Sequence, residues 1–378
     1  MPRPTSLCGF VLILIIACGV NMSHRVLGWH RVSQWHSRTV MGTGDESPSQ
    51  SSGLGTATHI VQPFGVEVLR DGRVLVTEVS HHRIWAFDPS TGECQVILGS
   101  GRKGYDDAGG AALEIAMDEP YEVRESNDGS LYWVEMRNHI VRRWDPDTDH
   151  VETIAGTGMP GFGGDGGPAR DAQLQQPHSL VIDEQRRQIY VADIGNHRIR
   201  AIDLNDGTIR TLAGNGERVA PREGQPIENT PVLGPRALAI DADRLWVALR
   251  EGHSLWSIDL TAGTWHHAAG RGSRGFQPEP VAADQAMFDG PKGIALTPDG
   301  RVAIVDTENH AIRLYDPKTQ TVSTLSGAGP ASRGYQEGES PAEIQMNRPH
   351  GIAIDSEGAI HVGDSENHRL RVLLPTTR

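Results

Sequence analysis

Residues 177–200 read PHSLVIDEQRRQIYVADIGNHRIR, and this stretch decides the fold. After a proline at 177, a first apolar segment lies over 180–183, a second follows at 188–192, and a third at 198–202. A fourth segment of the same kind lies at 209–213. Each is about five residues long, which is typical of a strand and too short for a helix. We therefore predict four short antiparallel strands from this unit.

The same unit recurs six times along the chain. Its opening proline stands at Pro63, Pro120, Pro177, Pro235, Pro291 and Pro349. A histidine near the middle of each unit repeats with the same period, at His82, His139, His197, His253, His310 and His368. Because two independent markers agree on a period of 56–58 residues, the chain is a repeat array.

Four-stranded units repeated radially build a β-propeller. The last unit stops after its third strand, at residues 370–374, which leaves a sheet edge that must be covered. Residues 39–42, ahead of the first unit, have the pattern of a fourth strand. We therefore predict an all-β, six-bladed propeller in one domain over residues 38–378, closed by an N-terminal strand that completes the last blade.

Four units carry an Asn-His motif at the start of the third strand: NHIVR at 138–142, NHRIR at 196–200, NHAIR at 309–313 and NHRLR at 367–371. These segments resemble the Asn-His-Leu signature of NHL repeats, and the flanking glycine-rich segments are similar to those of bacterial members. The resemblance extends over the whole chain after residue 37 and implies NHL-type blades. The units with His82 and His253 keep the histidine and lack the asparagine.

Composition limits the functional classes. The chain of 378 residues has 35 Lys and Arg against 48 Asp and Glu, a formal net charge of −13. This balance disfavours nucleic acid as a partner, so an RNA-binding NHL domain ranks third among our hypotheses. Cys94 is the one cysteine beyond residue 18, and no intrachain disulfide is expected in the propeller.

The N-terminal segment indicates export. Residues 10–18 form an apolar run that suits a signal peptide and is too short to span a bilayer. Its end, Ile15-Ile16-Ala17-Cys18, resembles the lipobox of bacterial lipoproteins. We expect a signal peptide over 1–18, a linker over 19–37, and a periplasmic, lipid-anchored or secreted protein. A membrane contact is expected only through a lipid at Cys18.

Several residues that resemble parts of a metal, catalytic or dinucleotide site are better explained as structural features of the repeat. The six histidines recur at the same corner of six different blades, which points to structural hydrogen bonds rather than to a metal site. The acidic residues that end the second strands are expected to anchor the next turn or to pair with the arginine of the motif: Glu78, Glu135, Asp193, Asp306 and Asp364. The G-x-G-x-x-G segments, such as 99–104, do not open a helix, so a dinucleotide site is rejected.

A propeller chain enters each blade near the axis, so the residues after the six prolines should surround one mouth of the central channel. They are Phe64, Tyr121, His178, Arg236, Lys292 and His350. The next position is small in five units and is Glu122 in the second, while Arg250 follows the blade-four position where other units have an acid. The candidate binding residues are Tyr121, Glu122, His178, Arg236, Arg250, Lys292 and His350. Their chemistry predicts a pocket for a small anionic ligand, a peptide or a protein.

Two functional classes follow. The first is a non-catalytic binding or scaffold module, expected to be a monomer and to need no cofactor. The second is a metal-dependent lyase or hydrolase, because the segments at Pro177-His178 and Pro349-His350 resemble ligand strands of the propeller lyase that amidates peptidyl-hydroxyglycine. In that class His178 and His350 would bind zinc or calcium. Glu122 or Tyr121 would serve in acid–base steps, and Arg236 or Lys292 would hold an anionic group.

Overall fold

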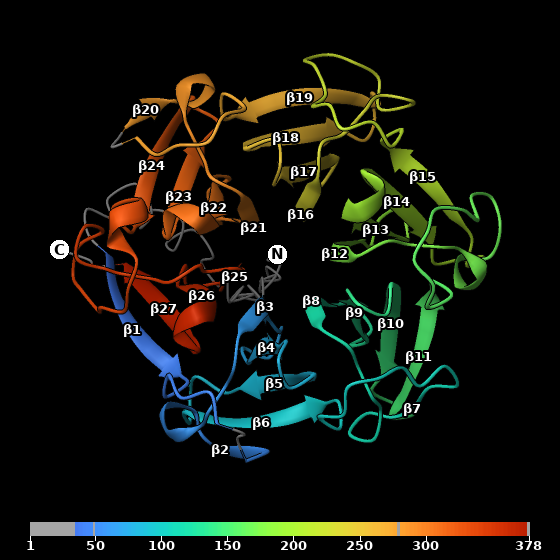
Figure 1. Ribbon diagram of the computed structural model, residues 1–378, viewed down its shortest axis with the longest axis horizontal. Coiled ribbons are helices and arrows are strands. Elements are labelled where there is room, and N and C mark those ends of the chain that lie inside the picture. Colours follow the sequence, from blue (N-terminus) through green and yellow to red (C-terminus); the bar gives the residue numbers. More distant parts are fainter. Residues whose placement is uncertain (1–34, 48–49, 278–279, 376–378) are drawn as a thin grey trace, which may run out of the picture.

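The protein forms a ring of six antiparallel sheets around a central axis (Figure 1). The computed structural model describes residues 35–47, 50–277 and 280–375. Among these residues the helical segments are 3-10 turns of three residues, and none is long and apolar enough to cross a membrane. The architecture is the predicted all-β, six-bladed propeller.

Each blade has four strands, numbered outward from the channel. Blades one to three consist of β3 (Pro63–Val68), β4 (Val74–Glu78), β5 (Arg83–Phe87) and β6 (Glu93–Leu98); β8 (Pro120–Glu125), β9 (Leu131–Glu135), β10 (Ile140–Asp145) and β11 (His150–Ala155); and β12 (Pro177–Asp183), β13 (Gln188–Asp193), β14 (Arg198–Asp203) and β15 (Ile209–Ala213). Blades four to six consist of β16 (Pro235–Asp241), β17 (Arg244–Leu249), β18 (Ser254–Asp259) and β19 (Thr264–Ala269); β21 (Pro291–Leu296), β22 (Val302–Asp306), β23 (Ala311–Asp316) and β24 (Thr321–Ser326); and β25 (Ile352–Ile354), β26 (Ile360–Asp364), β27 (Arg369–Pro375) and β1 (Trp35–Met41). Short outer strands extend three blades: β2 (Ser52–Leu54), β7 (Gly110–Ala111) and β20 (Val281–Ala282).

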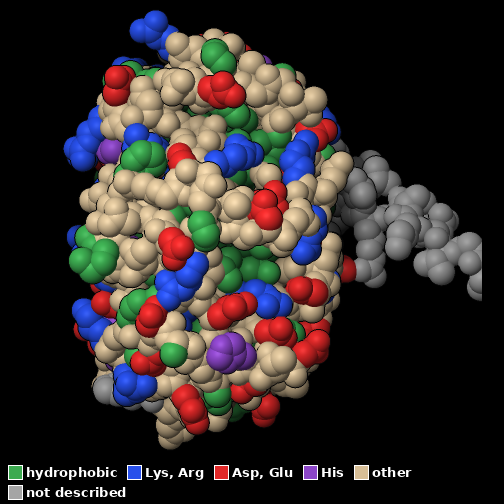
Figure 2. Space-filling view, turned by 90° about the vertical axis from the view of Figure 1, so that its right-hand side faces the viewer, with side chains coloured by type: hydrophobic (Ala, Val, Ile, Leu, Met, Phe, Trp, Pro, Cys, Tyr) green, Lys and Arg blue, Asp and Glu red, His purple; other side chains and the backbone are tan. Residues whose placement is uncertain are grey.

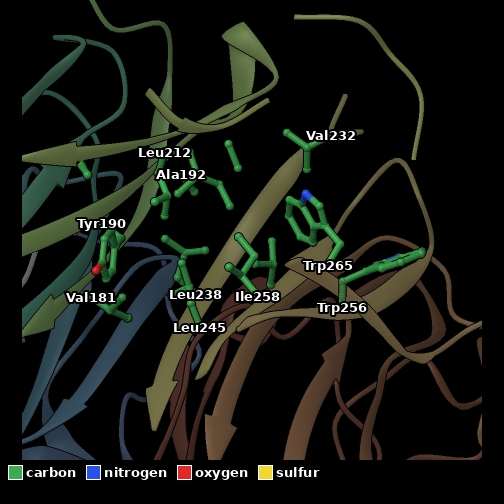
Figure 3. Close-up of a cluster of buried hydrophobic side chains, with 14 of the residues drawn as sticks. Val181, Tyr190, Ala192, Leu212, Val232, Leu238, Leu245, Trp256, Ile258 and Trp265 are labelled. Carbon is green, nitrogen blue, oxygen red and sulfur yellow. The ribbon is translucent and has the colours of Figure 1, made fainter. Parts of the chain in front are cut away.

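The hydrophobic core lies between neighbouring blades. Second strands such as β4 and β22 are buried at every residue, because a sheet packed on both sides leaves neither face to solvent. Between blades three and four, Tyr190 and Leu212 face Leu238 and Trp265 (Figure 3). Each pair of neighbouring blades therefore shares one hydrophobic core, so a single blade could not bury its apolar side chains without its neighbours.

The N-terminal strand closes the ring. In Figure 1, β1 lies beside β27, the last strand of the chain, and their register runs from Trp35 opposite Pro375 to Met41 opposite Leu370. Trp35 and Met41 are buried, and Arg371 donates a hydrogen bond to Ser37. The strand thus begins at Trp35, inside the segment expected to be a linker (19–37). The remainder of that segment and the expected signal peptide lie outside the described residues.

The inner strands come very close to each other around the channel. At the second position after the proline, a Cβ on Gly351 would stand 1.9 Å from the carbonyl oxygen of Phe64 in the next blade. The equivalent contact for Gly293 would be 2.3 Å, from the carbonyl oxygen of His350. Small residues recur at this position because the neighbouring backbone leaves no room for a side chain.

We predict that Gly351→Ala destabilises the ring. The added methyl group meets backbone, which cannot move aside as a side chain can, so the loss should be about 1–3 kcal/mol. Urea unfolding measures it. Gly167→Ala is the matched control, since neither glycine has a left-handed φ and the nearest atom to the new methyl group there is 3.5 Å away. Equal midpoints for the two variants would contradict the prediction.

Candidate binding site at the channel mouth

The acidic residues of the repeat hold the blade corners, as predicted. In four blades the carboxylate that ends the second strand pairs with the arginine of the motif at 3.0–3.5 Å and accepts a hydrogen bond from its asparagine. The corners are Glu135 with Asn138 and Arg142, Asp193 with Asn196 and Arg200, Asp306 with Asn309 and Arg313, and Asp364 with Asn367 and Arg371. These carboxylates are buried and belong to the scaffold.

The six motif histidines join each blade to the next, which confirms their structural role. All six have a left-handed backbone, with φ between 45° and 55°. Each accepts, through Nδ1, a hydrogen bond of 3.0–3.2 Å from the backbone N–H of the residue that directly precedes the opening proline of the next blade. The entry point of every blade is therefore fixed by the corner of the blade before it.

Aromatic caps over the corner arginines were not predicted from the sequence. The side chains of Tyr105, Phe162, Phe276 and Tyr335 lie over the guanidinium groups of the four corners, with Cζ 4.8–5.1 Å from the ring centroid. In each case the aromatic residue directly follows a glycine-rich segment. That recurrence was the available signal, and it explains these segments as supports for a cation–π contact.

Blades one and four depart from the motif in different ways. In blade one, Glu78 keeps its role: it is bonded by His81 and Trp85, which stand at the positions of the missing asparagine and arginine, and it pairs with Arg83 at 2.8 Å. In blade four, Leu249 and Trp256 make the corner apolar. Arg250, the residue after Leu249, has 42% of its side chain exposed and pairs with Glu251 at 2.7 Å.

The aromatic residues after the prolines form a continuous contact around half of the axis. The Phe64 ring stacks on His350 with centroids 3.9 Å apart, and Tyr121 meets the Phe64 edge at 5.0 Å. Tyr121 in turn contacts His178 at 4.7 Å. His178 and His350, predicted to share one site, therefore lie in a single ring of side chains with two aromatic residues between them on this side.

The second half of the ring is cationic. The Arg236 guanidinium lies 5.3 Å from the Tyr121 centroid, and Lys292 Nζ lies 3.4 Å from His350 Nε2. Burial lowers the pKa of Lys292 to about 8, although an ion pair with Glu308 at 2.8 Å opposes the change. The mouth thus combines aromatic surface with two buried cations.

Arg236 carries an unused hydrogen-bond donor at the channel mouth. Its side chain is 3% exposed, and within the described part of the chain its Nη1 atom has no hydrogen-bond partner. The carboxylate of Glu122 is 3.9 Å away. A guanidinium has five N–H donors, and leaving a buried donor unpaired costs about 1–3 kcal/mol. An anion at this position would relieve that cost.

Glu122 belongs to an ion-pair chain inside the channel wall. Its carboxylate accepts a hydrogen bond of 2.6 Å from Ser179 and one of 3.1 Å from Arg124. Arg124 continues to Glu67 at 3.4 Å. Burial raises the pKa of Glu122, while Arg124 and Arg236 oppose this. The exception to the small-residue rule therefore places a buried charge between the blades, next to Arg236.

The two ring histidines are neutral bases. Burial lowers the pKa of His178 well below its ordinary value, and Arg236 lowers it further. The pKa of His350 is lowered in the same way by burial and by Lys292. Each Nδ1 lies 2.7–2.9 Å from a backbone carbonyl, to which it donates. The remaining Nε2 atoms are acceptors, so the cations in the ring supply all of its positive charge.

A hollow of about 570 Å³ opens beside the ring over blades four to six. It is lined by Arg250, Glu251, His253, Arg274, Asp289, Gly290, Lys292, Glu308 and Arg348. The structure thus brings the predicted residues Arg250 and Lys292 into one cavity. Arg274 and Arg348 were missed, although Arg348 directly precedes Pro349, where no other unit has a cation.

The residues at the mouth do not fit a metal centre. Across residues 35–47, 50–277 and 280–375, no group of three or more His, Cys, Asp or Glu side chains is arranged to hold an ion. The ammonium group of Lys292 stands at His350 Nε2 and would repel zinc or calcium there. We therefore derive no reaction step through a metal.

Comparison with known proteins agrees with this architecture. The sequence matches the NHL repeat family at residues 174–202, 288–315 and 346–373. NHL repeat-containing protein 2 from Bos taurus is 28% identical over 334 residues, covering 80% of this chain and 44% of that protein. SUPPRESSOR OF QUENCHING 1 from Arabidopsis thaliana is 27% identical over 314 residues, covering 80% of this chain and 29% of that protein. The chain spans less than half the length of these relatives.

Solved structures support the fold. An auxiliary nutrient binding protein from Bacteroides ovatus superposes with a TM-score of 0.67 and 14% identity, covering 91% of this chain and 77% of that one. A streptogramin B lyase superposes with a TM-score of 0.53 and 14% identity, covering 91% of this chain and 99% of that one. The protein is a six-bladed β-propeller with a cationic channel mouth. It contains NHL repeats and is similar to NHL repeat-containing proteins.

We predict that Arg236→Met raises the pKa of His178. The guanidinium is the largest charged contribution that lowers this pKa, after burial. Wild-type His178 should stay neutral well below the pH at which an exposed histidine titrates, and the variant should take up its proton at higher pH. NMR titration of the imidazole carbons measures both. His253 is the internal control, because Arg236 is not among the groups that shift its pKa; equal movement of both histidines would argue against the contact.

Proposed function

We propose that this protein is a binding module whose ligand-binding face is the channel mouth at the proline end of the blades. The ligand is a small anion, or an acidic segment of a peptide or protein. The observation that carries the proposal is the buried Arg236 guanidinium, whose Nη1 has no hydrogen-bond partner in the described residues. A carboxylate or phosphate group would supply what this donor lacks.

The surroundings of Arg236 support the same ligand class. Lys292 adds a second cation in the ring, and Arg250 and Arg348 line the adjoining hollow. The aromatic faces of Phe64 and Tyr121 give an apolar side to the same mouth. A few polar groups beside apolar surface are what a ligand site needs for orientation and affinity. Because the two histidines are neutral, the positive charge that attracts an anion comes from the arginine and lysine side chains.

The test is binding of named anions to the purified protein. Phosphate, acetate, citrate and an Asp/Glu-rich peptide are titrated by calorimetry, and thermal unfolding is followed in parallel. We expect at least one anion to bind and to raise Tm, and Arg236→Met to weaken that binding about tenfold or more, which corresponds to about 1.4 kcal/mol.

Arg102→Met is the matched control, since it removes an exposed arginine from a loop at the same end of the ring. It should leave the affinity within about twofold, as expected for an exposed charge. Failure of every anion to bind, or equal binding by Arg236→Met and the wild type, would remove the basis for the proposal.

We also propose that the protein is exported and is lipid-anchored at Cys18. The sequence Ile15-Ile16-Ala17-Cys18 at the end of the apolar run supports this. In a bacterial host that processes lipoproteins, the wild type should be found in the membrane fraction and Cys18→Ser should not. A Cys94→Ser variant controls for the loss of a thiol. Equal distribution of Cys18→Ser and the wild type would exclude the lipid anchor.

A further inference from the structure

Lysine is rare in this protein, and one of its lysines is buried at the channel mouth. The chain has 35 basic residues, and the three lysines among them are Lys103, Lys292 and Lys318. Arginine supplies the others, and Figure 2 shows basic side chains interleaved with acidic ones over the outer side of the ring. Arginine stays protonated in proteins, whereas lysine can lose its proton and act as a nucleophile. Lys292, 8% exposed, therefore differs from the other buried cations in the chemistry that it offers.

The Lys292 ammonium group is held by two side chains. Its Nζ lies 2.8 Å from Glu308 Oε1 and 3.4 Å from His350 Nε2, and these atoms are its hydrogen-bond partners within the described part of the chain. An ammonium group has three N–H bonds, so one position on the nitrogen is left for a ligand. The side chain lines the hollow of about 570 Å³ beside the ring, which gives a small molecule access to the nitrogen.

The surroundings of Lys292 favour its neutral amine. Burial, with smaller contributions from Arg348 and Arg236, lowers the pKa of Lys292 to about 8 against the ion pair with Glu308. An ordinary lysine has a pKa of about 10.4, so at pH 7 the neutral fraction of Lys292 is on the order of a hundredfold larger. The neutral His350 accepts a hydrogen bond from the nitrogen at Nε2. The amine is therefore both available and oriented at neutral pH.

Glu308 lies where a positively charged product at Nζ would need it. Its carboxylate accepts hydrogen bonds of 3.0 and 2.9 Å from the Arg348 guanidinium, which fix its position beside Lys292. Although burial opposes the change, the hydrogen bonds from Arg348 and Lys292 lower the pKa of Glu308 to about 2. A protonated imine at Nζ keeps the positive charge of the lysine and hence this ion pair. The carboxylate therefore stabilises an iminium ion at this position.

We propose that Lys292 forms a reversible imine with an α-oxo acid bound in this hollow. This rests on the proposed function, because the carboxylate of the oxo acid is the anion that the arginines of the mouth bind. The neutral amine donates its electron pair to the carbonyl carbon, and a proton passes from the nitrogen to the carbonyl oxygen. The resulting hydroxyl group takes up the proton that the ammonium form had released and leaves as water. The nitrogen electron pair then forms the C=N bond of the iminium ion.

The test is reductive trapping on the full chain with pyruvate and cyanoborohydride. Lactate has the same carboxylate without the carbonyl group, and ethyl pyruvate has the same carbonyl group without the charge. We expect pyruvate to add a carboxyethyl group to Lys292, located by peptide mapping, and lactate to add none. At pH 7 Lys292 should be modified at least about tenfold faster than Lys103 or Lys318. Lys103, with 66% of its side chain exposed, is the internal control for an accessible amine.

Arg236→Met tests the role of the carboxylate. It should lower the ratio of the pyruvate rate to the ethyl pyruvate rate at Lys292 about tenfold, whereas Arg102→Met should leave this ratio within about twofold. The ratio cancels any change in the amine itself, because both reagents react with the same nitrogen. Thermal unfolding confirms that each variant is folded, and the adduct is located in the wild type, so that result needs no variant.

The outcomes separate the imine from the anion site. Binding of lactate, measured by calorimetry, without an adduct at Lys292 would overturn the imine and leave the proposed function intact. An adduct at Lys292 with an unchanged ratio in Arg236→Met would overturn the oxo acid as the ligand. Equal rates at the three lysines would overturn the special reactivity of Lys292. Absence of both lactate binding and an adduct would count against the imine and the anion site together.

Discussion

The ring depends on a buried carboxylate at the end of the second strand. In four blades this group binds the asparagine and the arginine of its own motif and a backbone N–H of the preceding loop. The motif histidine then accepts a hydrogen bond from a backbone N–H at the start of the next blade. Strand pairing stabilises each blade separately, whereas these corner contacts set the position of one blade relative to the next. The positions of the residues after the prolines follow from them.

Buried ion pairs are costly to form, and apolar residues often replace them without loss of stability. Blade four shows this within the same molecule, because Leu249 and Trp256 make its corner without charges. The residue after Leu249 is Arg250, which lines the hollow on the channel-mouth face together with Glu251 and pairs with it at 2.7 Å. A departure from the repeat in the scaffold thus lies next to the candidate site.

The sequence was sufficient for the fold because its markers are periodic. Six prolines and six histidines define the blades, and the missing fourth strand predicts the closure by the N-terminal strand. The start of that strand at Trp35 was missed, since a fourth strand contains neither marker. The aromatic caps and the partners of Glu122 were missed for another reason. They depend on contacts between different blades, such as the hydrogen bond from Ser179 to Glu122. The spacing of residues within one repeat does not predict which side chains of two blades meet.

An ion-pair chain in the channel wall runs from one mouth of the channel toward the other. Glu67 lines a hollow of about 330 Å³ at the end opposite Arg236 and pairs with Arg124 at 3.4 Å. Arg124 also pairs with Glu122 at 3.1 Å, and the Glu122 carboxylate lies 3.9 Å from Arg236. Burial raises the pKa of Glu67 to about 7 against the opposing charge of Arg124. Two acids and two arginines thus alternate along the wall, so each of these buried charges has an opposite charge beside it.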